Sequence, residues 1–141
     1  MRRSIAGLLA LVVVLGAGAT PAHASKPTVE VTPHTGLSYN SEVMVSGDGW
    51  RPNSNVWVRQ CSAGIWTGDE NACGIRTLKR IKRHTHHFFM RDTIVVGVIG
   101  DGGCATTPQN FRSCAIEVVQ LDENNQPTAT VALRRIAFAS D

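Results

Sequence analysis

The chain has 141 residues and a formal net charge of +3, from 14 basic and 11 acidic residues. That length suits one domain with one modest core. No segment approaches the roughly 20 consecutive apolar residues of a membrane-spanning helix. A composition so near neutrality does not call for nucleic acid or an anionic membrane as a partner. Any such partner must therefore be bound by a local patch.

Residues 1–24 have the features of a secretory signal peptide. Arg2 and Arg3 precede a short apolar run, and Ala22-His23-Ala24 places small residues at the expected cleavage site. We therefore expect a secreted, extracellular protein without a transmembrane anchor, whose mature domain spans 25–141. Loss of the two arginines leaves 12 basic residues against 11 acidic ones, a formal charge of +1.

All four cysteines, Cys61, Cys73, Cys104 and Cys114, lie in the expected mature domain. An even number of cysteines in an exported chain indicates disulfides, and four cysteines allow three pairings. We expect the two local pairs, Cys61–Cys73 and Cys104–Cys114, because each closes one loop between neighbouring strands. Closing such a loop is worth on the order of 3 kcal/mol in the chain-entropy description. A zinc site is the alternative, but the cysteines lack the close spacing of structural zinc ligands.

From Thr28 onward, apolar and polar residues alternate in short runs that end at Gly, Pro, Asn or Asp. Apolar residues do not recur at helical spacing over any long stretch. The pattern predicts an all-β, immunoglobulin-like sandwich of seven or eight short strands. The expected strands are 28–32, 42–46, 56–60, 93–99, 114–121 and 128–138.

The last expected strand changes phase along its length. Val131 and Leu133 share one parity, whereas Ile136 and Phe138 share the other. If both pairs face a single core, one extra residue must be accommodated between them. We therefore predict a β-bulge near Arg134-Arg135.

Several runs carry a resemblance to a known family. Val31–Leu37 reads VTPHTGL, Val43–Trp50 reads VMVSGDGW, and Val56–Cys61 reads VWVRQC. With Asp101–Ala105 and Cys114–Val118, they resemble the neocarzinostatin family of enediyne-binding apoproteins over most of residues 27–121. The resemblance implies a seven-stranded immunoglobulin-like barrel with two disulfides beside an open cleft. In the best-known members this cleft holds a DNA-cleaving chromophore, which links the family to DNA binding and antibiotic activity.

The resemblance also implies candidate cleft residues. Its register turns Ala115, Glu117 and Val119 toward the cleft. Trp66, inside the first disulfide loop, is a candidate wall, as are Phe88 and Phe89, although one of these adjacent rings is expected to face the core.

Two departures from the family pattern bear on the ligand. The stretch between Cys73 and Cys104 is shorter than in chromophore carriers. Glu117 also puts a carboxylate where a flat apolar guest would lie. Burying that carboxylate is costly unless Arg59 or the basic residues 79–83 neutralise it.

The stretch 76–91 is basic, with no acidic residue and three histidines. One interpretation is a patch for DNA or an anionic cell-wall polymer. The other is an exposed hairpin or edge strand whose charges discourage strand pairing between molecules. His84, His86 and His87 lack an evident further ligand, so no metal site is predicted. The patch residues are Arg76, Lys79, Arg80, Lys82 and Arg83.

No nucleophile elbow, paired-carboxylate signature or phosphate loop is present, so we do not expect an enzyme. We expect a secreted, monomeric binding protein for a small hydrophobic or aromatic molecule, with no cofactor other than a non-covalently bound chromophore. The alternative is an extracellular or cell-wall module that binds no small ligand and uses the basic 76–91 surface.

Overall fold

The computed structural model of the chain describes residues 25–62, 73–74, 76–99, 102–106 and 113–140. The predicted signal peptide lies outside the described residues. Among those described, all regular structure is β, and no helix could cross a membrane. The strands are β1 Thr28–Thr32, β2 Glu42–Asp48, β3 Asn55–Cys61, β4 Thr77–Arg80, β5 Phe88–Ile94, β6 Val98–Ile99, β7 Gly102–Gly103, β8 Cys114–Leu121 and β9 Pro127–Ile136.

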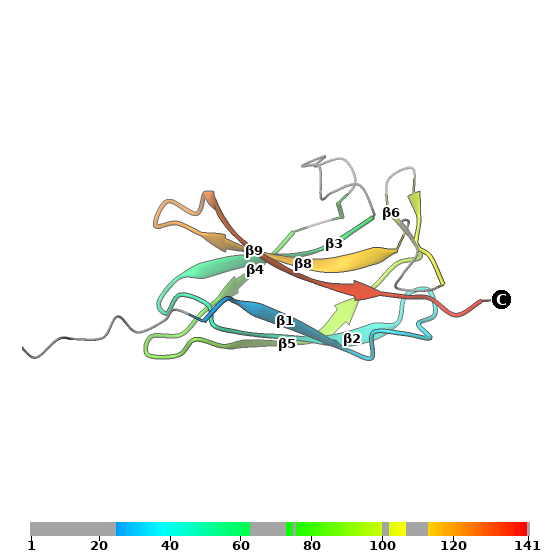
Figure 1. Cartoon of the computed structure of the whole chain (residues 1–141), viewed down its shortest axis with the longest axis horizontal. Coiled ribbons are helices and arrows are strands. Elements are labelled where there is room, and N and C mark those ends of the chain that lie inside the picture. The colour runs from blue at the N-terminus through cyan, green and yellow to red at the C-terminus, as the bar shows by residue number, and fades with distance from the viewer. Residues whose placement is uncertain (1–24, 63–72, 75, 100–101, 107–112, 141) are drawn as a thin grey trace, which may run out of the picture.

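Seven of these strands form a sandwich of two antiparallel sheets (Figure 1). The three-stranded sheet has the order β1-β2-β5, and the four-stranded sheet has the order β4-β3-β8-β9. The two-residue strands β6 and β7 pair separately. The predicted all-β, immunoglobulin-like architecture with seven principal strands is confirmed.

The two sides of the sandwich differ. On one side β1 packs against β9, where Arg134 lies 3.8 Å from Glu30 and 3.2 Å from His34. On the other side the edge strands are β4 and β5. These strands follow each other in the chain but belong to different sheets. The stretch 76–91 is therefore not a hairpin, and β4 is an edge strand as the second interpretation of this stretch predicted.

The core lies between the sheets and is built from the inward residues of each alternating strand. Val45, Val56 and Ile116 are fully buried there. Trp50 is also fully buried and packs edge-on against Phe88, with ring centroids 6.1 Å apart. A side chain at position 47 would collide with both rings, so this strand position requires glycine.

Both predicted disulfides are present. Cys61 is bonded to Cys73, and Cys104 to Cys114. Each pair ties a segment to the same end of the four-stranded sheet, because Cys61 ends β3 and Cys114 begins β8.

Two sequence predictions about strands are wrong. The predicted strand 93–99 is interrupted after Ile94, because the backbone of Val96 bonds to the side chain of Gln60 rather than to a strand. The predicted bulge near Arg134-Arg135 is absent, since β8 and β9 stay in register from Cys114↔Ile136 to Val119↔Val131. Val131 and Leu133 face outward instead, so the phase change reflects two faces rather than an inserted residue.

Candidate functional site

The outer face of the four-stranded sheet carries an apolar row that crosses every strand. Leu78 pairs with Trp57, Trp57 pairs with Val119, and Val119 pairs with Val131. Cross-strand partners point to the same face of a sheet. The four side chains therefore form one continuous strip, and Leu133 extends it along β9.

Several members of this strip are open to solvent. Leu78 is 56% exposed, and Val131 and Leu133 are each 39% exposed. Single exposed apolar side chains are common on protein surfaces, whereas several that gather on one face indicate a binding surface. The inward residues of the same strands already fill the core, so this strip is additional to what folding requires.

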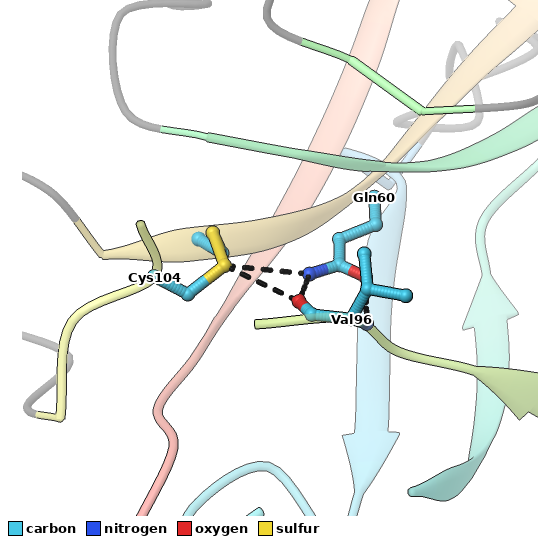
Figure 2. Close-up of a disulfide and its surroundings, with 4 residues drawn as sticks. Gln60, Val96 and Cys104 are labelled. Carbon is cyan, nitrogen blue, oxygen red and sulfur yellow. Dashed lines mark hydrogen bonds between the residues drawn. A yellow bond between two sulfur atoms is a disulfide. The ribbon is translucent and has the colours of Figure 1, made fainter. Parts of the chain in front are cut away.

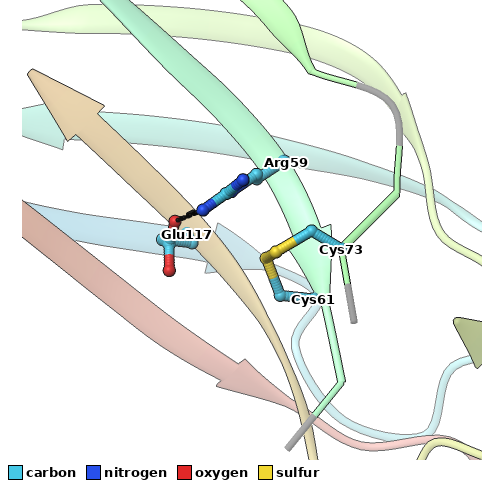
Figure 3. Close-up of polar contacts among 4 residues, drawn as sticks. All are labelled: Arg59, Cys61, Cys73 and Glu117. Carbon is cyan, nitrogen blue, oxygen red and sulfur yellow. Dashed lines mark hydrogen bonds and ion pairs between the residues drawn. A yellow bond between two sulfur atoms is a disulfide. The ribbon is translucent and has the colours of Figure 1, made fainter. Parts of the chain in front are cut away.

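An ion pair lies beside the strip. Arg59 on β3 is the cross-strand partner of Glu117 on β8, and its Nη2 lies 2.8 Å from Glu117 Oε1 (Figure 3). Arg59 Nε donates a second hydrogen bond to the same oxygen at 2.9 Å. Both side chains are about nine-tenths buried. Glu117 is therefore neutralised by Arg59, one of the two sources considered from the sequence.

Further groups border this face at the disulfide end. Arg76 stacks its guanidinium over the Trp57 ring at 4.3 Å from the centroid, a favourable cation–π arrangement. The Cys61–Cys73 disulfide follows Arg59 on β3 (Figure 3). At this end the strip is therefore bordered by the positive charge of Arg76 and by the Cys61–Cys73 disulfide.

The predicted cleft residues are only partly brought together. Ala115, Glu117 and Val119 lie on the outer face of β8, all buried. Phe88 is in the core at 4% exposure, whereas Phe89 is 40% exposed on the outer face of the other sheet. Neither phenylalanine meets the β8 residues, because β5 belongs to the three-stranded sheet. Trp66 lies outside the described residues.

Trp57, Leu78, Val131 and Leu133 were not predicted for this site. The sequence could have indicated them, because each is an apolar residue at a strand position whose side chain points away from the core. For Trp57 this is visible, since Val56 and Val58 on either side are the inward pair. Val131 and Leu133 show the same pattern, but they were predicted to face the core.

The residues of the predicted basic patch are spread over β4, the residue before it and the loop that follows it. Arg76 lies at the outer-face strip, whereas Lys82 and Arg83 lie in the β4–β5 loop, beyond the other end of β4. That loop is held to the β2–β3 loop, where Trp50 N donates to His86 O at 2.9 Å and Ile81 N donates to Ser54 O at 2.8 Å. Lys79 and Arg80 connect the two parts along β4.

A hollow of about 850 Å³ opens beside the β4–β5 loop. Its lining includes Lys26, Arg51 and His86, with Asp48 as the acidic member. No group of three or more His, Cys, Asp or Glu side chains suited to a metal occurs within the described ranges.

The structure of macromomycin aligns with the chain at a TM-score of 0.51 and 23% sequence identity, over 80% of this chain and 99% of macromomycin. The chain has the macromomycin fold. No family model and no curated protein sequence matches it. The likeness to macromomycin therefore bears on architecture, and the ligand has to be argued from the residues of the outer face.

Proposed function

We propose that the protein is a secreted, non-catalytic binding protein that holds a small aromatic or hydrophobic molecule on the outer face of the four-stranded sheet. The observation that carries the proposal is the apolar strip Leu78–Trp57–Val119–Val131, which crosses all four strands and is exposed at its two ends, Leu78 and Val131. Macromomycin, an enediyne apoprotein of the neocarzinostatin family, supports a carrier scaffold.

The strip supplies a favourable free energy for an apolar guest. Removing apolar surface from water contributes about 25 cal/mol per Å². An aromatic ring packed edge-on against Trp57, whose face Arg76 covers, adds about 1 kcal/mol beyond the area alone. Flat, apolar molecules are therefore the favoured class of ligand.

The Arg59–Glu117 pair determines how deep such a ligand lies. The two side chains occupy the middle of the face and already bond to each other. A guest that displaced one of them would leave a buried charge without its partner, which is costly. The ligand therefore lies along the apolar strip and over the ion pair rather than beneath it.

Secretion agrees with the two disulfides, because such bonds persist in oxidising compartments. The amino-terminal sequence pattern supports the same compartment. We propose cleavage after Ala24 and an extracellular site of action.

The proposal is tested by the fluorescence anisotropy of 9-anthracenemethanol titrated with the exported chain. Wild type is expected to bind it, and Trp57→Ala to weaken binding about tenfold or more, since a central aromatic anchor is lost. Met44→Ser is the matched control, because Met44 is 37% exposed on the outer face of the other sheet. Trp66→Ala reports whether the first disulfide loop contributes a wall.

Unchanged affinity in Trp57→Ala would remove the outer face from consideration. Equal losses in Trp57→Ala and Met44→Ser would indicate non-specific adsorption to exposed apolar residues. Either result contradicts the proposal.

The alternative function is an extracellular or cell-wall module that binds an anionic polymer. The observation in its favour is the hollow beside the β4–β5 loop, where Lys26 and Arg51 lie near the basic stretch. Binding of this kind falls steeply with salt, because counterions are released. Retention on a teichoic acid or DNA column would then be lost in a Lys82→Ser/Arg83→Ser variant but not in Trp57→Ala. Retention that persists in the first variant would exclude Lys82 and Arg83, and retention that also persists in Lys26→Ser/Arg51→Ser would exclude the hollow.

A further inference from the structure

A second cavity lies at the open side of the sandwich, and Arg59, Arg91 and Asp92 contribute charged groups to its lining. It opens between the edge strands β4 and β5, on the side opposite the β1–β9 contact. Its volume is about 610 Å³, within the range of small-molecule sites. Its apolar lining comes from both sheets and from the segment after β5: Val58, Met90, Val96 and Ile99.

A β-bulge shapes one wall of this cavity. Val45 pairs with Met90 and Val43 pairs with Thr93, so β5 has one residue more than β2 between these pairs. Asp92, within the bulge, has a φ of 58°. Because Val43 and Val45 both face the core, the bulge turns Met90 and Thr93 inward together, although their separation of three would otherwise put them on opposite faces.

The opposite wall is fixed by Gln60. Its side-chain amide donates to Val96 O at 2.6 Å and accepts from Val96 N at 2.9 Å, and it lies 3.5 Å from Cys104 Sγ (Figure 2). The amide thus pairs with the Val96 backbone as a neighbouring strand would. This clamp fixes the segment after β5 at the distance of one side chain from β3, where both Gln60 and Val96 line the cavity.

One polar group in the cavity lacks a partner. The hydroxyl of Thr93 is buried and makes no hydrogen bond to any part of the chain that the structure describes. Buried polar atoms are nearly always paired, so an orphan hydroxyl lining a cavity marks a place for a ligand atom.

We propose that this cavity is a second binding site, for a compact, mostly apolar molecule whose one hydroxyl or carbonyl group bonds to Thr93 Oγ1. The apolar body contacts Met90, Val58 and Ile99, and the molecule enters between β4 and β5. Val58, Met90 and Thr93 are inward residues of their strands, which distinguishes the site from the apolar strip, although Arg59 of the outer-face ion pair also borders the cavity.

The test uses 2-naphthol and naphthalene, which differ by a single hydroxyl. The exported chain is labelled with ¹³C at the methionine methyl groups, and signals are assigned with Met90→Leu and Met44→Leu. Addition of 2-naphthol is expected to shift the Met90 signal and leave that of Met44, on the outer face of the three-stranded sheet, unchanged. Affinity for 2-naphthol should exceed that for naphthalene about fivefold, the worth of one hydrogen bond.

Two variants at position 93 isolate the hydroxyl. Thr93→Val keeps the shape and should abolish the preference for 2-naphthol, whereas Thr93→Ser should retain it. Both affinities are read from the Met90 signal, and Trp57→Ala should leave them unchanged even where it weakens binding at the outer face, which separates the two sites. An unshifted Met90 signal in wild type, or equal affinities for the two probes, would overturn the proposal, and neither result depends on the variants folding.

Discussion

The two faces of the four-stranded sheet use the same strands for different purposes. On the inner face of β8, Ile116 and Val118 are fully buried among apolar neighbours. On the outer face, Glu117 is also buried but bonds to Arg59, and its cross-strand neighbour Leu133 is 39% exposed. The hydrophobic effect accounts for the apolar residues of the inner face. On the outer face, Glu117 and Arg59 are charged at buried positions where apolar residues would favour folding.

This contrast explains why β8 is buried along its whole length. One side is covered by the opposite sheet, and on the other side the β8 side chains lie between those of the neighbouring strands β3 and β9. Replacing a buried ion pair by apolar residues is often neutral or stabilising. The pair on the outer face is therefore better explained by a role in recognition than by a need for stability.

The largest loss of stability is expected on the inner face. Ile116→Ala removes a fully buried side chain and leaves a cavity, so the free energy of unfolding should fall by about 3–4 kcal/mol. Urea unfolding followed by circular dichroism measures it, with an unchanged slope showing that the unfolding mechanism is preserved. A loss below about 1 kcal/mol would mean that this face is not the core.

Breaking the ion pair on one side should cost somewhat less. Arg59→Leu leaves the Glu117 carboxylate buried without its partner, and we expect a loss of about 2–3 kcal/mol. The double variant Arg59→Leu/Glu117→Leu should recover to within about 1 kcal/mol of wild type. Additive losses in the double variant would show that the pair is a structural requirement, against the interpretation given above.

The alternation of apolar and polar residues predicted best those strands that bury one face and expose the other. Strands β1 and β8 begin and end where the sequence indicated, and Val29 and Val31 on β1 face the core as their parity requires. Strand β4 was predicted only as an edge strand somewhere in 76–91, without bounds, because it has no buried face to produce an alternating pattern. Strand β5 was missed in part because its bulge breaks the two-residue period that identifies a strand.

The candidate site was predicted only through β8. The parity of Ala115, Glu117 and Val119 places them together, but the parity of Val131 and Leu133 does not distinguish an outer apolar strip from a core. The clamp between Gln60 and Val96 spans 36 positions, and local sequence carries no signal for such a pairing.

The clamp leads to a smaller and more local prediction. Gln60→Met removes both hydrogen bonds to Val96 while keeping a similar volume, and should cost about 1–2 kcal/mol. The rate of hydrogen exchange at the Val96 amide should rise by a larger factor than the loss in the free energy of global unfolding accounts for. Exchange at the core amide of Val118 serves as the control. Equal acceleration at both amides would mean that the segment after β5 is not held separately.

The smallest effect is expected at the exposed end of the strip. Leu133→Ser should change the free energy of unfolding by less than about 0.5 kcal/mol, since Leu133 is 39% exposed. It should nevertheless weaken binding of 9-anthracenemethanol. A large loss of stability would show that Leu133 serves folding, and the contrast between the two faces would then fail.

The location of a bound aromatic molecule tests the account most directly. Backbone amide NMR spectra of residues 25–141, recorded during a titration with 9-anthracenemethanol, monitor the whole domain in one experiment. The account predicts the largest shifts at Trp57, Val119 and Leu133, with Met44 unaffected. Shifts confined to the β4–β5 loop, or no shift at the three outer-face residues, would contradict it.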